Sequence, residues 1–419
     1  TLTLEDCLRI GIDNNLSLEG KRKEIQKSKY GVSENRSKLL PQITVIAGYN
    51  NNFDPPVSVT DGSSYGVPYN ITKTLQHTAN AGLEMQMPLF NQTLYTSMSI
   101  AKVMEEISRL SYGKAREDII MQISKMYYLG QVTAEQIVLI KANITRLEEL
   151  RDITQAFFDN GMSMEVDLKR VNINLENLKV QYDNAQAMMK QQLNMLKYIM
   201  DYPAEKEFVL TPVNTDSITT VALTGLSENI YELQLSQSQV QLAEKQKKII
   251  SNGYIPSLSL TGSWRYAAYT DKGYHWFHSG PSNHWFRSYG LGLTLRIPIF
   301  DGLDKTYKIK KAMIDIENRK LAWENARKSL QTQYLNAVND LMNNQRNFKK
   351  QKDNYLLAED VYTVTSDRYR EGIASMTEVL QDEMQMSEAQ NNYISAHYNY
   401  RITNLMLLKL TGQIESLVK

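Results

Sequence analysis

Apolar and polar residues alternate one by one in four short stretches of the chain, at residues 42–49, 77–90, 257–266 and 287–300. Because the side chains of a β-strand point alternately to its two faces, this period of two predicts four half-buried strands. Two of them end in similar sequences, GLEMQMPLF at Gly82–Phe90 and GLTLRIPIF at Gly292–Phe300. We interpret these as the last strands of two hairpins, with Pro88 and Pro298 marking the change from strand to helix.

Apolar residues three and four positions apart follow the strands in each half of the chain. No proline occurs from Leu89 to Tyr202, or from Ile299 to the end, and proline disfavours a helix interior by about 3 kcal/mol. One apolar ladder in the first stretch comprises Ile137, Ile140, Ile144, Leu147, Leu150, Ile153 and Phe157. Narrow apolar stripes among charged residues are typical of coiled-coil seams, so both stretches are predicted to form long helices.

A glycine stands near the middle of each helical stretch. Between Asp304 and Thr411 the only glycine is Gly372, and its counterpart in the first half is Gly161. A lone glycine after a long apolar ladder predicts a helix C-terminal cap with positive φ, followed by a returning helix. Each half is therefore expected to contain a long helical hairpin, with its tip at residues 160–163 or 371–375.

The two halves repeat one plan. Pro88 and Pro298 are 210 positions apart, and Gly161 and Gly372 are 211 apart. The chain is predicted to be a duplication whose seam lies near residues 203–225. The first repeat, 1–212, would hold a helix, a β-hairpin at 42–90 and a helical hairpin at 92–202. The second, 213–419, would hold a helix, a β-hairpin at 256–300 and a helical hairpin at 303–412.

Composition excludes several functional classes. The 47 Lys and Arg residues balance 46 Asp and Glu residues, for a net charge of +1, so no basic surface for nucleic acid is expected. The only cysteine is Cys7, which excludes disulfides within the chain and Cys-based zinc sites. Phosphate loops, nucleophile elbows and zinc-protease motifs are missing, so neither catalysis nor a cofactor is expected.

The sequence also lacks the patterns of a membrane-spanning helix and of a signal peptide. No run approaches 18 apolar residues, which argues against a membrane-spanning helix. The start at Thr1 lacks the basic and apolar regions of a signal peptide, so we expect a cytoplasmic protein or one whose signal has been removed.

Four strands of about ten residues are too few to close a barrel, for which about eight is the practical minimum. Strands of that length match a membrane barrel, so several chains are expected to pool their strands, with the apolar faces toward lipid. Two alternatives are a pair of sandwich hairpins and a soluble coiled-coil scaffold with a small capping sheet. In every case the fold class is mainly α with a small β part.

The order of helix, strand, long loop, strand and very long helical hairpin, twice over, resembles the TolC-type outer-membrane efflux proteins. The resemblance covers essentially the whole chain, from LTLEDCLRIGIDNNLSL at Leu2–Leu18 to AHYNYRITNLMLLKLTGQI at Ala396–Ile414. It implies a homotrimer with a twelve-stranded barrel in outer-membrane lipid, continued by a helical tunnel in the periplasm. It also implies a non-catalytic exit duct that works with a periplasmic adaptor and an inner-membrane transporter. The expected cargo is small molecules, and the alternative is a protein, as in type I secretion.

The resemblance implies that the hairpin tips meet the adaptor. The matching glycines are Gly161 and Gly372, and the neighbouring tip residues are Asn160, Met162, Ser163, Glu371, Ile373, Ala374 and Ser375. The alternative is that both glycines are helix caps without a docking role.

The resemblance also implies an acidic periplasmic entrance after the second tip, in the stretch TEVLQDE. Glu378 takes the first acidic place, whereas Asp382 lies one residue beyond the second, which Gln381 occupies. Tyr369 matches the tyrosine before the tip glycine, and Ala374 replaces a basic residue sometimes found after it. The alternative for Glu378 and Asp382 is a solvated charged face.

Three histidines, His275, His278 and His284, lie close together in the segment 274–286. No carboxylate or cysteine is interleaved with them, and Gly273, Gly280 and Pro281 favour a loop. We therefore expect an exposed aromatic loop here and no metal site.

Overall fold

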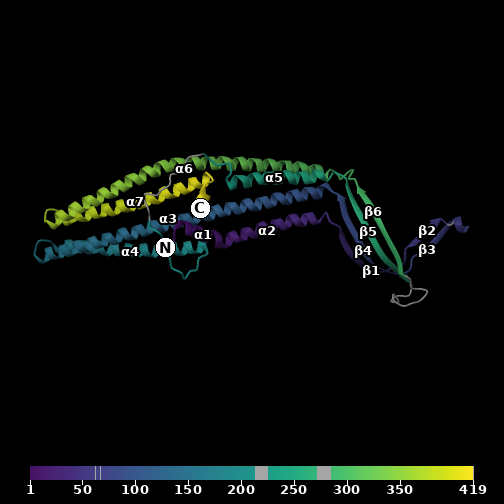
Figure 1. Ribbon diagram of the computed structural model, residues 1–419, viewed down its shortest axis with the longest axis horizontal. Coiled ribbons are helices and arrows are strands. Elements are labelled where there is room, and N and C mark those ends of the chain that lie inside the picture. The colour runs from purple at the N-terminus through teal and green to yellow at the C-terminus, as the bar shows by residue number, and fades with distance from the viewer. Residues whose placement is uncertain (62, 67, 213–224, 271–284, 419) are drawn as a thin grey trace. The chain divides into compact units, whose positions relative to one another are not determined.

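The computed structural model describes residues 1–61, 63–66, 68–212, 225–270 and 285–418, and it is mainly α-helical with a small β part (Figure 1). The chain divides into two compact units. Unit 1 comprises Thr1–Ile25, Ile107–Ser238 and Lys320–Lys419, and unit 2 comprises Gln26–Glu106 and Gln239–Arg319. Unit 2 contains the strands, and unit 1 contains the helical hairpin tips.

Four antiparallel strands form the sheet of unit 2, in the order β1-β4-β5-β6 (Figure 1). Their bounds are β1 Gln42–Asn51, β4 His77–Phe90, β5 Ser257–Thr270 and β6 Trp285–Arg296. Because β4 pairs with β5, one sheet joins strands from both halves of the sequence.

The pairing register separates an apolar face of this sheet from a polar one. Leu83, Trp264 and Tyr289 lie side by side across three strands on the apolar face. Gln86 and Thr261 lie side by side on the other face, where small and polar residues dominate. The four predicted strands and their alternation of faces are thus confirmed.

Two expectations about the strands and loops were wrong. Pro88 lies inside β4, and the register of β4 against β5 shifts between Pro88 and Phe90. Proline has no N–H to donate, so the ladder is irregular there and the strand ends two residues later. The long loop expected between the first two strands contains a separate two-stranded pair, β2 Val57–Asp61 and β3 Tyr69–Lys73, and the short 3₁₀ helix η1 Ser63–Tyr65. Most of the histidine segment at 274–286 lies outside the described residues.

Long helices make up the remainder of the structure. They are α1 Leu4–Asn14, α2 Leu16–Ser37, α3 Gln92–Asp159, α4 Glu165–Met200, α5 Tyr231–Asn252, α6 Asp304–Arg370 and α7 Met376–Leu410, followed by the 3₁₀ helix η2 Ile414–Val418. The long proline-free helices are confirmed, since α3 has 68 residues and α6 has 67. None of the helices in the described part of the chain combines the length and apolar content needed to cross a membrane.

Four apolar clusters lie in the described part of unit 1, and the two largest each join several helices. One packs α1 against α3, α4 and α7 through fully buried residues that include Leu8, Ile123, Met200 and Leu405. The other lies nearer the hairpin tips, where Leu147 of α3, Leu175 of α4, Tyr362 of α6 and Val379 of α7 are buried. Since all four hairpin helices contribute to the second cluster, the tips extend from a packed base.

Candidate functional site

The two hairpin tips have the same backbone design. The Gly161 N–H donates to the carbonyl of Phe158 at 2.9 Å, and the Met162 N–H donates to that of Phe157 at 2.8 Å. At the second tip, Gly372 donates to Tyr369 at 2.9 Å and Ile373 to Arg368 at 2.8 Å. This pair of bonds is the Schellman motif, which satisfies the last carbonyls of a helix.

Positive φ at both tip glycines is confirmed, with values of 72° at Gly161 and 76° at Gly372. A Cβ added at either position would meet nothing within 4 Å. Glycine is therefore needed here for its backbone conformation and not because space is short.

The two tips differ in how the returning helix begins. At the second tip, Ser375 and Glu378 form a capping box: the Ser375 N–H donates to Glu378 Oε2 at 2.7 Å, and the Glu378 N–H donates to Ser375 Oγ at 3.3 Å. At the first tip, the N-cap residue Met164 makes no side-chain capping bond. Met162 and Met164 are exposed there, as is Ile373 at the second tip. Both tips thus present apolar side chains to solvent on a fixed turn.

Tyr369, predicted to lie at the entrance, is buried between α6 and α3. Its hydroxyl lies 3.2 Å from Thr154 Oγ1, and its ring packs against Phe157 with 5.6 Å between centroids. Next to it, Arg370 donates to Glu149 at 3.4 Å. Tyr369 therefore connects the two helical hairpins of one chain through a hydrogen bond and a ring contact.

The two predicted entrance carboxylates have different environments. Glu378 is exposed, and the backbone hydrogen bond from Ser375 lowers its pKa, so it is ionised at neutral pH. Asp382 is half-buried one turn further along α7. They lie four residues apart and share a helix face.

The structure also reveals a carboxylate that the sequence analysis missed. Glu383 of α7 is only 5% exposed, and its Oε1 has no hydrogen-bond partner among the described residues. Burial raises its pKa, and the positive charge of Arg146 opposes that rise; Arg146 itself pairs with Glu359 at 2.7 Å. The sequence could have indicated this burial, because Glu383 lies three residues after Leu380 and three before Met386, and both of these are buried.

We predict that Glu383→Gln stabilises unit 1 increasingly as pH rises. Because the folded pKa lies above the ordinary 4.5, the unfolded chain releases this proton first. Stability is then lost as pH climbs from 4.5 through the folded pKa, and Gln removes that loss while keeping the shape. Thermal unfolding at pH 4 and pH 8 measures the effect, with the exposed Glu388→Gln as control. Equal shifts at both pH values would contradict the assignment.

No group of three or more His, Cys, Asp or Glu side chains that could hold a metal ion occurs in the described ranges. The tips and the predicted entrance residues instead offer exposed apolar side chains and carboxylates. Exposed apolar side chains suit contact with a protein, and carboxylates suit attraction of cations.

Comparison with known proteins identifies a family whose model matches most of the chain. The family model described as "Outer membrane efflux protein" matches residues 10–200 and 214–413. "Outer membrane protein TolC" of Vibrio cholerae is 21% identical over 396 residues, covering 91% of this chain and 84% of that protein. "Probable efflux pump outer membrane protein TtgC" of Pseudomonas putida is 23% identical over 382 residues, covering 85% and 75%.

The fold has solved counterparts as well. The crystal structure of the outer membrane protein VceC from Vibrio cholerae superimposes with a TM-score of 0.78 at 14% identity. The superposition covers 97% of this chain and 96% of the VceC chain.

Proposed function

Because the chain belongs to the outer membrane efflux protein family and is an outer-membrane exit duct for efflux, we propose that three copies build that duct together. Their strands form one twelve-stranded barrel in the outer membrane, and their long helices continue it as a periplasmic tunnel. The tunnel receives small molecules from an inner-membrane transporter through a periplasmic adaptor bound at the hairpin tips.

The observation that carries this proposal is the incomplete sheet of unit 2. Strands β1 and β6 are the outer strands of the four, and each pairs with only one neighbour in the described part of the chain. The apolar face is uncovered, with Val45 74% exposed and Leu291 79% exposed. Free edges and a bare apolar face would aggregate in water, so pairing between copies and contact with lipid supply what one chain lacks.

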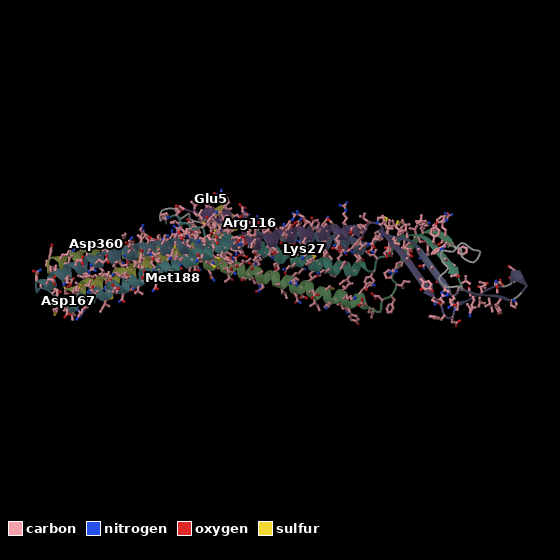
Figure 2. All side chains as sticks on the ribbon, turned by 90° about the horizontal axis from the view of Figure 1, so that it is seen from below. Glu5, Lys27, Arg116, Asp167, Met188 and Asp360 are labelled. Atoms are coloured by element: carbon pink, nitrogen blue, oxygen red, sulfur yellow. The ribbon has the colours of Figure 1, made fainter. Side chains whose placement is uncertain are left out.

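Uncovered heptad stripes on the helices of unit 1 support the same assembly. On α4 the exposed apolar residues recur every seven or eight positions, at Val166, Ile173, Val180, Met188 and Met195; Figure 2 labels Met188. On α6 the exposed residues Leu321, Leu335, Met342 and Leu356 recur at multiples of seven. A seven-residue apolar repeat is the seam of a coiled coil, so a neighbouring copy is its natural partner.

The division into repeats 1–212 and 213–419 is part of the proposal. It is supported by the family model, which matches the chain twice in succession. Each repeat then supplies two strands and one helical hairpin to the duct.

The test is the molecular mass of the detergent-purified protein, measured by light scattering. We expect three times the mass of one chain, and Ile173→Glu should reduce the trimer because it places a charge in the α4 stripe. Asn172→Glu, also exposed on α4 but off the stripe, is the matched control. A monomeric wild type that leaves the membrane in carbonate would contradict the trimeric duct.

A further inference from the structure

A cavity of about 390 Å³ opens on the polar face of the sheet where the strands meet the helices of unit 2. Arg296, the last residue of β6, and Lys38, which directly follows α2, both line it. Its other polar lining consists of hydroxyls and amides, including Ser257, Ser259 and Gln86. All of these groups can donate hydrogen bonds.

No carboxylate is among the described residues that line this cavity. Glu84, the acidic residue of the adjoining polar surface, is paired with Arg265 at 2.6 Å. Lys38 lies 3.3 Å from Glu34, but that glutamate is 70% exposed, and such surface pairs contribute little. Arg296 has no ion-pair partner in the described chain, so a positive charge is left uncompensated.

The charge of the surrounding unit reinforces the same sign. Unit 2 contains 18 Lys and Arg residues against 12 Asp and Glu residues, a formal net charge of 18 − 12 = +6. The chain as a whole carries only +1. A concave surface of one sign concentrates the opposite ion, so this cavity attracts anions.

We propose that the cavity binds small oxyanions, the carboxylate or phosphate groups of exported molecules, so that the strand end of the duct favours anionic cargo. The Arg296 guanidinium presents the planar fork that matches such groups in a bidentate manner, and Lys38 adds a point charge. The proposal rests on the proposed function, since cargo passes Arg296 only if the polar face of the sheet lines the duct.

Binding of tripolyphosphate and of citrate to the purified full chain, measured by calorimetry, tests the site directly. We expect Arg296→Gln to weaken binding about tenfold or more, because a hydrogen bond to a charged group is lost. Arg296→Lys should fall between wild type and Arg296→Gln, since it keeps the charge without the fork. The matched control is Arg287→Gln on the same strand, because the register places Arg287 on the opposite, apolar face. Equal affinity in wild type and Arg296→Gln would overturn the proposal.

Planar-bilayer recording separates this site from the duct. With neutral lipid, tripolyphosphate added from the strand side should block the wild-type current and block Arg296→Gln about tenfold less. If the wild-type protein binds the anion but conducts no current, the proposed duct is contradicted and the proposed anion site is not. Native mass spectrometry tests whether the phosphate comes instead from a lipid headgroup. If a phosphate-bearing lipid is bound by the wild type and lost in Arg296→Gln, while tripolyphosphate binding is unchanged, the binding of exported anions is overturned.

Discussion

Gly372→Val should abolish efflux while leaving trimer assembly and membrane insertion intact. The glycine has a φ of 76°, a region that costs an L-residue roughly 1–2 kcal/mol and a β-branched residue more. A Cβ added at this position would meet nothing within 4 Å, so the strain comes from the backbone conformation. The turn is then expected to open, because the hydrogen bonds from Gly372 and Ile373 to α6 depend on that conformation.

The effect is expected to stay local. The buried residues of the apolar cluster nearest the tips all lie in the helices before and after the turn, so the packed base persists. What changes is the presentation of Ile373 and Ala374, which we propose contact the adaptor. Gly161→Val should act in the same way on Met162 at the first tip.

Two glycine variants serve as controls for this experiment. Gly372→Asn keeps a residue that tolerates positive φ, so it should retain most efflux. Gly31→Val places the same new side chain inside α2, where a Cβ also meets nothing within 4 Å. Efflux and cross-linking to the adaptor are the readouts. If Gly372→Val matches wild type in both, the tips are caps and not docking surfaces.

The strands and long helices were predictable because each rests on a local pattern. The alternation in 257–266 holds for ten residues without a break, and it sets the faces of β5 before any partner is known. The pair β2 and β3 was not predictable in the same way. Each has five residues within a Gly-, Pro- and Ser-rich stretch, so turn-forming residues dominate the local signal.

The candidate site was predictable in part. The tip glycines follow from a lone glycine after a long ladder, and Ser-x-x-Glu at 375–378 is itself a capping signature, so the bond to Glu378 was available from the sequence. The spacing of Glu383 with Leu380 and Met386 indicates its burial, but its lack of a hydrogen-bond partner and the contact of Tyr369 with Thr154 depend on how α7 and α6 pack against α3. Such packing between distant segments leaves no trace in the spacing of a single helix.

Removing the charges of Glu378 and Asp382 together should weaken cation selectivity and relieve block by trivalent cations. The two carboxylates lie on one face of α7, directly after the second tip. Three copies would bring six of them to a narrow mouth, where attraction to cations grows as the local dielectric constant falls. Block by a trivalent cation from the periplasmic side should weaken about tenfold or more.

The choice of substitution matters because Glu378 also caps α7. Glu378→Gln keeps an acceptor for the Ser375 N–H and removes only the charge, since Gln serves equally in a capping box. Glu378→Ala would remove both, so a change in conductance would be mixed with fraying of the helix. The informative variant is therefore Glu378→Gln with Asp382→Asn, and its thermal unfolding should match that of wild type.

Glu388→Gln supplies the matched control for this ring. Glu388 is an exposed carboxylate on the same helix, ten residues after Glu378 and about 80° away around the helix axis. The substitution Glu388→Gln removes one charge per chain and leaves the helix face that carries Glu378 and Asp382 unchanged. Single-channel recording in planar bilayers compares the two. If the double variant keeps the wild-type selectivity and block, or if Glu388→Gln changes them as strongly, then Glu378 and Asp382 belong to a solvated outer face and the constriction lies elsewhere.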